Sequence, residues 1–272
     1  MKLATVVVVY NPKPEVLTNI ASYAAQSDVL YVWDNTPGGS PLLEQLTVGR
    51  VMHHEHRNMG LPYPYNRAME AALNEGCTHL MTMDQDSRFE EFENYYDQLA
   101  KSIDEKIAIF TPPINHDRNS CGERYQNSCQ SGSVYPLHIL QSVGGFREDL
   151  FIGMVDAEIS LKVQERGYKI YQLVGCNLVH EVGSGRTVHF LGKSVEVTDY
   201  SPLRHYYDSR NRILLWHEFP YDVDARYRRQ LLVNRVKLIF KIALFEKDKW
   251  AKIKAIVRGT VNGLRNKVTP YE

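Results

Sequence analysis

The segment THLMTMDQDSRF, residues 78–89, joins an apolar run to a pair of carboxylates. Leu80 to Met83 are typical of a strand buried in a sheet, and Asp84 and Asp86 follow where that strand would reach the surface. Alternate residues of an extended chain point the same way, so both carboxylates can face one ion. Hard divalent cations take oxygen ligands and often bridge to substrate phosphates. An isolated D-x-D pattern is more often a strand end followed by a turn, so the rest of the chain has to decide between the two interpretations.

Strand-like and helix-like segments alternate on both sides of this stretch. Runs of β-branched residues, such as ATVVVVY at 4–10, are separated by segments whose apolar residues have helical spacing. This alternation predicts right-handed crossovers and an α/β fold with a mostly parallel central sheet flanked by helices. The expected strands are 4–10, 29–35, 49–56, 78–84 and 106–113, and the expected helices are 14–26, 65–75 and 90–103.

Polar residues follow three of these strands at the point where each strand ends. They are Tyr10 and Asn11, Asp34 and Asn35, and the Asp84–Asp86 group. In an open parallel sheet, ligands bind outside the carboxyl ends of the strands. We therefore expect the three groups to converge at one edge of the sheet.

The pattern becomes irregular after about residue 112. Segment 114–136 is polar and turn-rich, and segment 183–203 is expected to be a mobile loop. Further helices are expected at 156–166, 204–216 and 226–258, and two short strands at 168–174 and 176–182.

Three sites in this part of the chain are candidates for chemistry, and each has a structural alternative. Asp156 begins a predicted helix, where it is either an N-cap or a general base that accepts a proton from an attacking hydroxyl. His180 ends a predicted strand and is either a structural histidine or a metal ligand. Arg210 and Asn211, in RHYYDSRNR at 204–212, either hold phosphate or lie on an exposed helix face.

The composition is that of a globular intracellular protein. The chain has 272 residues, of which 43% are hydrophobic, enough for one large domain or a domain with an appendage. No apolar run approaches the roughly 20 residues of a membrane span. The N-terminal run breaks at Asn11-Pro12 and is predicted to be a first strand rather than a signal peptide. The cysteines lack C-x-x-C spacing and are predicted to be reduced thiols, consistent with a cytoplasmic location; they are Cys77, Cys121, Cys129 and Cys176.

Taken together, these landmarks resemble family 2 of the inverting, nucleotide-sugar-dependent glycosyltransferases, which have the GT-A fold. The resemblance spans roughly residues 3–215 and rests on order and spacing, since no single motif is specific. DQDS, FREDLFI and the later RN look most like the bacterial rhamnosyltransferase branch, which builds O-antigen and other surface polysaccharides. The landmarks are VVVVYNP at the start, DN at 34–35, RNMGLPYPYNRAME at 57–70, DQDS at 84–87, GGFREDLFIGMVDAEISLKVQERGY at 144–168, the histidine of LVHEVG, and YYDSRN at 206–211.

The resemblance implies a fold and a division of the chain. The fold would be α/β of the GT-A, Rossmann-like type, with a mostly parallel central sheet flanked by helices. A catalytic domain would span 1–215, with a nucleotide-binding half at about 1–112 and an acceptor-binding half at about 113–215. A basic helical extension would follow at 216–272.

The resemblance also implies a role for each candidate residue. Asp86 and His180 would hold Mg²⁺ or Mn²⁺, and Asp156 would be the catalytic base. Asp84 would approach the ribose or the metal. The nucleotide would further contact Tyr10, Asn11, Asp34, Asn58, Gly60 and Asn66, and phosphate or acceptor would contact Arg210 and Asn211.

The implied reaction moves a sugar, with rhamnose favoured, from a nucleoside-diphosphate sugar to a hydroxyl of a glycan or polyprenyl-diphosphate-linked glycan. The main alternative is the same fold with a UDP-hexose donor. A haloacid-dehalogenase-type phosphatase also uses D-x-D after a strand, but normally on the first strand and followed by Thr, whereas Ser87 follows here. A catalytically silent sugar-nucleotide-binding protein fits less well with the presence of all four residues Asp84, Asp86, Asp156 and His180.

The chain departs from the family pattern at several positions. Val155 stands where an acidic residue is frequent, and Gly153 where related rhamnosyltransferases commonly carry Asp. Pro62 and Pro64 are expected to stiffen a glycine-rich loop, and Lys162 in place of a common Arg is expected to matter little.

The end of the chain is strongly basic. Residues 1–225 carry 19 Lys+Arg and 29 Asp+Glu, whereas residues 226–272 carry 13 Lys+Arg and 3 Asp+Glu. Apolar residues at helical spacing lie among these charges between 231 and 264. The segment 226–265 is interpreted either as a helix that packs on the catalytic domain or as a peripheral contact with the inner face of the cytoplasmic membrane. Nucleic acid is not an expected partner, because no recognition motif accompanies the charge.

Overall fold

The chain folds into two compact units. Unit 1 comprises residues 1–151 and 155–181, and unit 2 comprises 152–154 and 182–272. The predicted boundary at residue 215 falls inside helix α6 (Pro202–Glu218), which is continuous. The computed structural model describes residues 1–102, 104–115, 122–124, 128–180, 185–190, 192–220 and 225–271, so Cys121 lies outside the described residues.

Unit 1 is built around a mixed sheet in which eight strands lie within the described residues, in the order β3-β2-β1-β4-β8-β6-β9-β7. The strands β3, β2, β1 and β4 pair in parallel, as do β6 and β9, whereas β8 is antiparallel to β4 and β6, and β7 to β9. The mostly parallel sheet predicted from the sequence is therefore confirmed. The bounds are β1 (Leu3–Val9), β2 (Val29–Asp34), β3 (Arg50–Met52), β4 (His79–Asp84), β6 (Ile107–Thr111), β7 (Gly122–Arg124), β8 (Val134–Pro136) and β9 (Lys169–Gln172).

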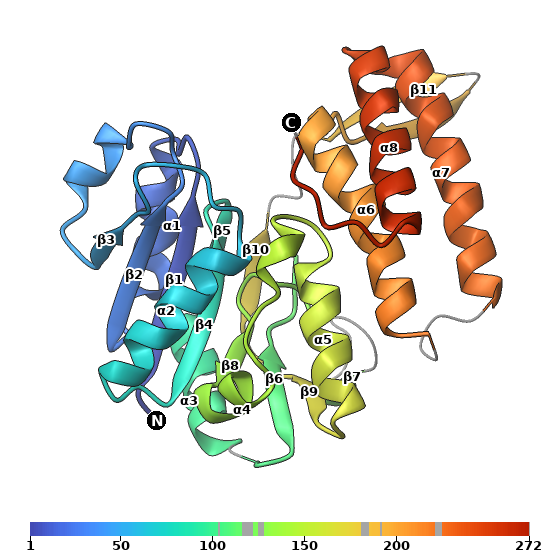
Figure 1. Ribbon diagram of the computed structural model, residues 1–272. Helices are drawn as coiled ribbons and strands as arrows, with labels where there is room; N and C mark the ends of the chain where they lie inside the picture. The colour runs from blue at the N-terminus through green and yellow to red at the C-terminus, as the bar shows by residue number, and fades with distance from the viewer. Residues whose placement is uncertain are drawn as a thin grey trace. The chain divides into compact units, whose positions relative to one another are not determined.

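Helices cover both faces of this sheet. All seven residues of β1 are buried, as expected for a central strand covered on both sides. Alternate residues such as Val7 and Met81 join one core cluster with apolar side chains of α1 (Glu15–Ala24) and α3 (Phe92–Lys101). Figure 1 shows α2 (Pro62–Asn74) on the face opposite α1. The remaining helices of unit 1 are η1 (Pro41–Gln45), α4 (Leu137–Ser142), η2 (Glu148–Leu150) and α5 (Val155–Glu165).

The two prolines expected to stiffen a loop lie instead in the first turn of α2. Pro62 is the first helical residue and Pro64 follows two residues later. Proline is tolerated there because the first turn has no intrahelical partner for its N–H groups. The helix consequently begins three residues before the predicted start at residue 65.

A short strand pair lies beside the end of β4, and it joins the predicted strand at 176–182 to a strand that was not predicted, at 87–90. The strand β5 (Ser87–Glu90) pairs antiparallel with β10 (Asn177–His180), and His180 lies opposite Ser87. The stretch after Asp86 is therefore an extended strand, and it pairs with a histidine that is 93 residues away in the sequence.

Unit 2 contains a β-hairpin and three helices within its described residues. The hairpin consists of β11 (Arg186–Phe190) and β12 (Lys193–Val197), so the predicted loop at 183–203 is wrong for these residues. The predicted helix 226–258 is two helices, α7 (Ala225–Phe245) and α8 (Lys249–Leu264), and Asp248 between them adopts a left-handed conformation with φ 52°. Among the described helices of the chain, none has the length and apolar character required to cross a membrane.

The helices α6 and α8 approach each other closely because α8 presents glycines to α6. A Cβ atom on Gly259 would lie 2.3 Å from the carbonyl oxygen of Tyr206, and one on Gly263 would lie 2.9 Å from that of Arg210. No larger residue fits at Gly259 without moving backbone. One face of the basic extension is thus packed against the helix that precedes it.

Candidate functional site

The ends of β1, β2 and β4 are tied together by hydrogen bonds. The backbone N–H of Tyr10 donates to Oε1 of Gln85 at 2.8 Å, and the N–H of Asn11 donates to Oγ1 of Thr36 at 2.9 Å. The buried Asp34 carboxylate accepts the N–H groups of Thr36 at 2.9 Å and Ser40 at 2.8 Å. The three polar groups therefore meet at one edge of the sheet, as the strand pattern predicted. Within this arrangement Asp34 shapes the loop after β2, and Tyr10 is 46% exposed.

The second wall of this edge is formed by the segment before α2. Asn35 holds it, donating from Nδ2 to the carbonyl of Gly60 at 2.7 Å and accepting the N–H of Met59 at 3.1 Å. Asn58 caps the same turn by accepting the N–H of Gly60 at 2.9 Å. Gly60 has φ 75°, and a Cβ atom there would lie 2.3 Å from the carbonyl oxygen of Phe151, so glycine is required. The sequence pattern places Asn35 beside Asp34 at the end of a strand and does not predict that it binds the segment 58–60.

Asn66 is used as an internal brace of unit 1. Its Oδ1 accepts the N–H of Phe146 at 2.8 Å, and its Nδ2 donates to the Phe146 carbonyl at 2.8 Å and to Glu148 at 2.9 Å. A Cβ atom on Gly145 would lie 2.6 Å from Asn66 Oδ1. Asn66 thereby fixes the segment that leads towards α5, and its direct contact with a nucleotide stays a prediction.

Asp84, Asp86 and His180 form a cluster whose ligand atoms all lie within 4.8 Å of one another. His180 Nδ1 is 3.4 Å from Asp86 Oδ1 and 2.7 Å from Ser87 Oγ. Backbone contacts fix both sides of the cluster, since the N–H of Asp84 donates to Ser131 Oγ at 3.0 Å and that of His180 to Asn115 Oδ1 at 3.0 Å. The two carboxylates supply the oxygen ligands that Mg²⁺ and Mn²⁺ prefer, and the imidazole adds a nitrogen ligand of the kind that transition metals accept.

Asp156 lies at the start of α5 and is half-buried, with Oδ1 accepting the N–H of Ala157 at 2.8 Å. The pKa of the Cys129 thiol shows that the charge of Asp156 acts on the same group as the charges of Asp84 and Asp86. Burial, together with the negative charges of Asp84, Asp156 and Asp86, raises the pKa of the Cys129 thiol to about 12. Asp156 therefore acts electrostatically on the same thiol as Asp84 and Asp86, although it is far from them in the sequence.

Arg210 and Asn211 serve the interior of unit 2. Arg210 is 1% exposed, its guanidinium lies 4.7 Å from the ring centre of Tyr207, and its Nη1 donates to the carbonyl of Thr269 at 2.7 Å. Asn211 is fully buried and donates from Nδ2 to the carbonyl of Gly153 at 2.9 Å. Arg210 therefore anchors the C-terminal segment, and the contacts of both side chains with phosphate or acceptor stay predictions.

Two of the departures from the family pattern acquire a physical reason. Gly153 has φ 75°, a left-handed conformation that glycine adopts at no steric cost. Lys162, expected to matter little, lies 2.6 Å from the carboxylate of Glu158, which is fully buried, and donates to the carbonyl of Gly145 at 3.0 Å. A buried carboxylate needs such a cationic partner, and Lys162 supplies the positive charge that an Arg at this position would also supply. Val155 is buried at the start of α5.

Comparisons with known proteins agree with this architecture. No family model matches the chain. The chain is 23% identical over 294 residues to a dTDP-rhamnosyl transferase, RfbF, of Shigella flexneri, covering 96% of this chain and 94% of that protein. Among solved structures it is similar to S. aureus TarS, with a TM-score of 0.58 at 15% identity over 98% of this chain and 82% of that chain. It is also similar to the mannosyltransferase PcManGT from Pyrobaculum calidifontis, solved with GDP-Man and Mn²⁺, with a TM-score of 0.56 at 13% identity over 97% and 75% of the two chains. The fold is thus the GT-A fold of glycosyltransferases, as the sequence predicted.

Proposed function

We propose that this chain, which has the GT-A fold, is a metal-dependent inverting glycosyltransferase. It would move a sugar from a nucleoside-diphosphate sugar to a hydroxyl of a glycan or lipid-linked glycan in surface polysaccharide synthesis. The observation that carries the proposal is the cluster of Asp84, Asp86 and His180 at the strand ends. Asp156 adds to it, because its charge raises the pKa of the Cys129 thiol together with the charges of Asp84 and Asp86. Rhamnose is the favoured sugar, because the curated relative is a dTDP-rhamnosyl transferase.

The cluster would hold Mg²⁺ or Mn²⁺ through Asp86 and His180, with Asp84 beside them. When bound, the ion supplies positive charge that stabilises the departing diphosphate. The protein's own contribution is to hold the ligands in place beforehand. The β5–β10 register sets His180 opposite Ser87, and Asn115 accepts the His180 N–H and donates from Nδ2 to its carbonyl at 2.9 Å.

Asp156 would act as the catalytic base. The acceptor hydroxyl oxygen forms a bond to the anomeric carbon while the bond from that carbon to the diphosphate oxygen breaks, and the hydroxyl proton passes to a carboxylate oxygen of Asp156. Attack opposite the leaving group inverts the anomeric centre. The start of a helix favours the ionised form of a carboxylate, which keeps Asp156 ready to accept the proton.

The nucleoside would lie along the edge formed by the ends of β1 and β2. Tyr10 offers an exposed ring for stacking on the base, and Asn11 and Asp34 stand beside it. The segment from Asn58 to Gly60 would close the pocket, held by Asn35. These assignments rest on the geometry of the strand ends and on the family resemblance.

Of the two alternative functions, the observations are compatible with one and disfavour the other. A UDP-hexose donor is compatible with the fold, since TarS has been solved with UDP-GlcNAc and PcManGT with GDP-Man. A haloacid-dehalogenase-type phosphatase fits poorly, because its aspartate pair belongs to the first strand, whereas Asp84 ends β4, which lies beside β1 in the sheet.

A thermal-shift screen tests the proposal. dTDP-rhamnose is compared with UDP-galactose, UDP-glucose and UDP-N-acetylglucosamine, each with and without Mn²⁺. A nucleotide sugar that binds the folded protein but not the unfolded chain raises the melting temperature, and the increase grows with the ratio of its concentration to Kd. Stabilisation by dTDP-rhamnose that requires Mn²⁺ supports the rhamnose donor, and stabilisation by a UDP-sugar alone assigns the alternative. No stabilisation by any nucleotide sugar, together with phosphate release from a phosphomonoester, would overturn the glycosyltransferase proposal.

A further inference from the structure

Helix α8 has two apolar faces, and only one of them is covered by the described residues of unit 2. Ala255 and Ile256 are buried, and Gly259 and Gly263 are in contact with α6. The second face is exposed at helical spacing. Its apolar residues are Trp250, 85% exposed, Val257, 53%, Val261, 36%, and Leu264, 61%.

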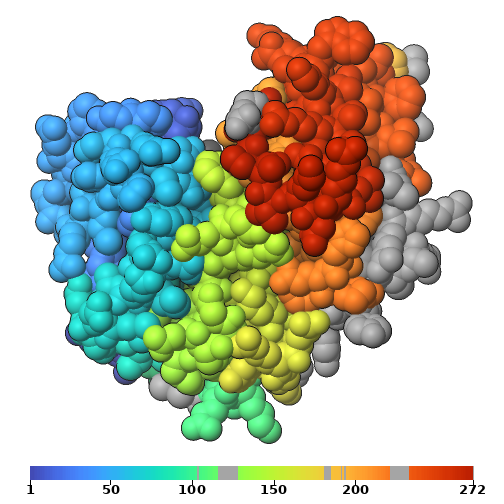
Figure 2. All heavy atoms as spheres, viewed as in Figure 1, coloured from blue at the N-terminus to red at the C-terminus, as the bar shows by residue number. Residues whose placement is uncertain are grey.

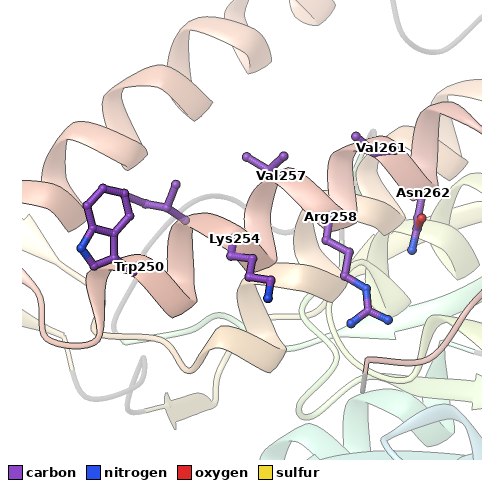
Figure 3. A pocket seen from close by; sticks show the side chains of 7 residues that line it. Trp250, Lys254, Val257, Arg258, Val261 and Asn262 are labelled. Carbon is purple, nitrogen blue, oxygen red and sulfur yellow. The ribbon is translucent and has the colours of Figure 1, made fainter.

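This exposed face is hollowed along its length. A groove of about 460 Å³ runs along α8 and is lined by Trp250, Ile253, Lys254, Val257 and Val261, among others. Figure 3 shows Lys254 and Arg258 projecting along one side of the helix, with Val257 and Val261 towards the other. Figure 2 shows that α8, in red, forms part of the outer surface of unit 2. An apolar stripe bordered by long basic side chains is therefore open to the surroundings.

The charges along α8 and the segment that follows it have one sign. Residues 249–271 contain six Lys and Arg and no Asp or Glu. One of the six, Lys252, turns inward and pairs with the buried Glu246 at 2.7 Å. The exposed basic side chains are Lys249, Lys254, Arg265 and Lys267. The stripe thus lies among exposed positive charges along α8 and the segment that follows it.

We propose that the exposed face of α8 docks onto the surface of an anionic lipid bilayer. Trp250, Val257, Val261 and Leu264 would enter the boundary between headgroups and acyl chains, and the basic side chains would contact the lipid phosphates. Tryptophan is favoured at this depth because its ring is apolar and its N–H can remain hydrated. Since no described helix is suited to crossing a membrane, α8 would lie in the plane of the surface.

Charge complementarity selects lipid over the other possible occupants. A second copy of the same face would bring two sets of four exposed basic side chains together, and like charges oppose such contact. Nucleic acid would satisfy the charge but would leave Trp250 and Leu264 against a polar backbone. Helix α7 strengthens the choice, since Val236, 54% exposed, Phe240, 64%, and Leu244, 57%, form another exposed apolar stripe at a spacing of four residues.

The test uses the full chain and vesicles of phosphatidylcholine, with or without phosphatidylglycerol. We expect co-sedimentation with the anionic vesicles at 50 mM salt, weaker binding at 500 mM salt, and little binding to the neutral vesicles. The fluorescence of Trp250 is expected to be quenched by lipids brominated on the acyl chain. Trp33 is buried and Trp216 half-buried, so Trp250→Phe identifies the part of the signal that belongs to α8.

Paired variants separate docking from a general charge effect. Lys254→Gln with Arg265→Gln is expected to weaken binding roughly thirtyfold, from about 1 kcal/mol per basic side chain near an anionic surface. Lys101→Gln with Lys106→Gln removes two exposed lysines from unit 1 and is expected to leave binding unchanged. Val257→Ser with Val261→Ser is expected to weaken binding without lowering the melting temperature, since both side chains are exposed.

Several results would overturn the proposal. They are an absence of binding to anionic vesicles at low salt, equal losses in the α8 and unit 1 lysine pairs, and unquenched Trp250. A concentration-dependent dimer that Val257→Ser with Val261→Ser converts to monomer, without vesicle binding, would assign the face to a second copy instead. The test does not use sugar transfer, so its outcome is independent of the proposed activity.

Discussion

Lys162→Met should destabilise unit 1 strongly, because it removes the ammonium group that lies beside the buried carboxylate of Glu158. Glu158 is fully buried, and Lys162 Nζ lies 2.6 Å from its Oε1 with a side-chain exposure of 19%. Removing one partner of a buried ion pair typically costs about 3–5 kcal/mol. The loss of the bond from Lys162 to the Gly145 carbonyl at 3.0 Å adds to this, since that bond links α5 to the turn that Asn66 holds. For a unit of this size, a loss of that magnitude lowers the melting temperature by roughly 6–20 °C.

The assay is thermal and urea unfolding of the wild type, Lys162→Met, Glu158→Gln, and the double variant. The double variant removes both charges, so it is expected to recover most of the loss, with a coupling of about 1–3 kcal/mol in the double-mutant cycle. Lys101→Met, an exposed lysine at the end of α3, is the matched control and should change stability by less than about 0.5 kcal/mol. The reasoning would be refuted if Lys162→Met unfolded like the control, or if the double variant were as unstable as Lys162→Met alone.

Three further predictions concern the site and the pH dependence of folding. Asp86→Ala should abolish Mn²⁺-dependent binding of nucleoside diphosphate, measured by titration calorimetry, and unchanged affinity with and without Mn²⁺ would remove Asp86 from the ligand set. Asp156→Asn should keep donor binding while the rate of transfer falls by about 10²–10⁴-fold, as expected for loss of a general base, and near-normal turnover would contradict this role. Burial lowers the pKa of His79 to about 4, and the unfolded chain takes up this proton near pH 6.5, so stability should fall as the pH drops from 6.5 to 4, by up to about 3 kcal/mol. His79→Gln should flatten the urea-midpoint profile across this window, and an unaltered profile would show that another group controls it.

The central strands could be predicted from sequence because burial on both faces leaves a continuous apolar run. This holds for β1 and β4, whose ends also lie within a residue or two of the predicted ends. The strands that were not predicted are short and are specified by distant partners. The three residues of β8 are too few for a recognisable period, and they are strand only because they lie between β4 and β6. The break between α7 and α8 depends on the left-handed conformation of Asp248, a position that no glycine or proline marks.

The candidate site could be predicted only as far as topology dictates it. The carboxyl ends of parallel strands meet at one edge, so the grouping of Tyr10, Asp34 and Asp84 followed from the order of the elements. The side chains that hold the site in place, Asn35 and Asn115, were not predicted, because an amide in a loop carries no signal of which backbone groups it will bind. Cys129 was predicted only as a reduced thiol. It is free, and its raised pKa comes from burial and from the charges of Asp84, Asp156 and Asp86, which are distant from it in the sequence.

The ligand set of the candidate metal centre depends on the register of one strand pair. Asp84 and Asp86 are local in sequence, whereas His180 is 93 residues from Ser87, which it faces across β5 and β10. A shift of one residue in this pairing would turn the histidine to the opposite face of the strand and leave two carboxylates without it. Asn115 opposes such a shift, because its side chain forms hydrogen bonds with both the N–H and the carbonyl of His180. A shifted strand would break both bonds. Asn115 and Ser87, which contact His180 directly, therefore hold the histidine beside the D-x-D pattern in the candidate site.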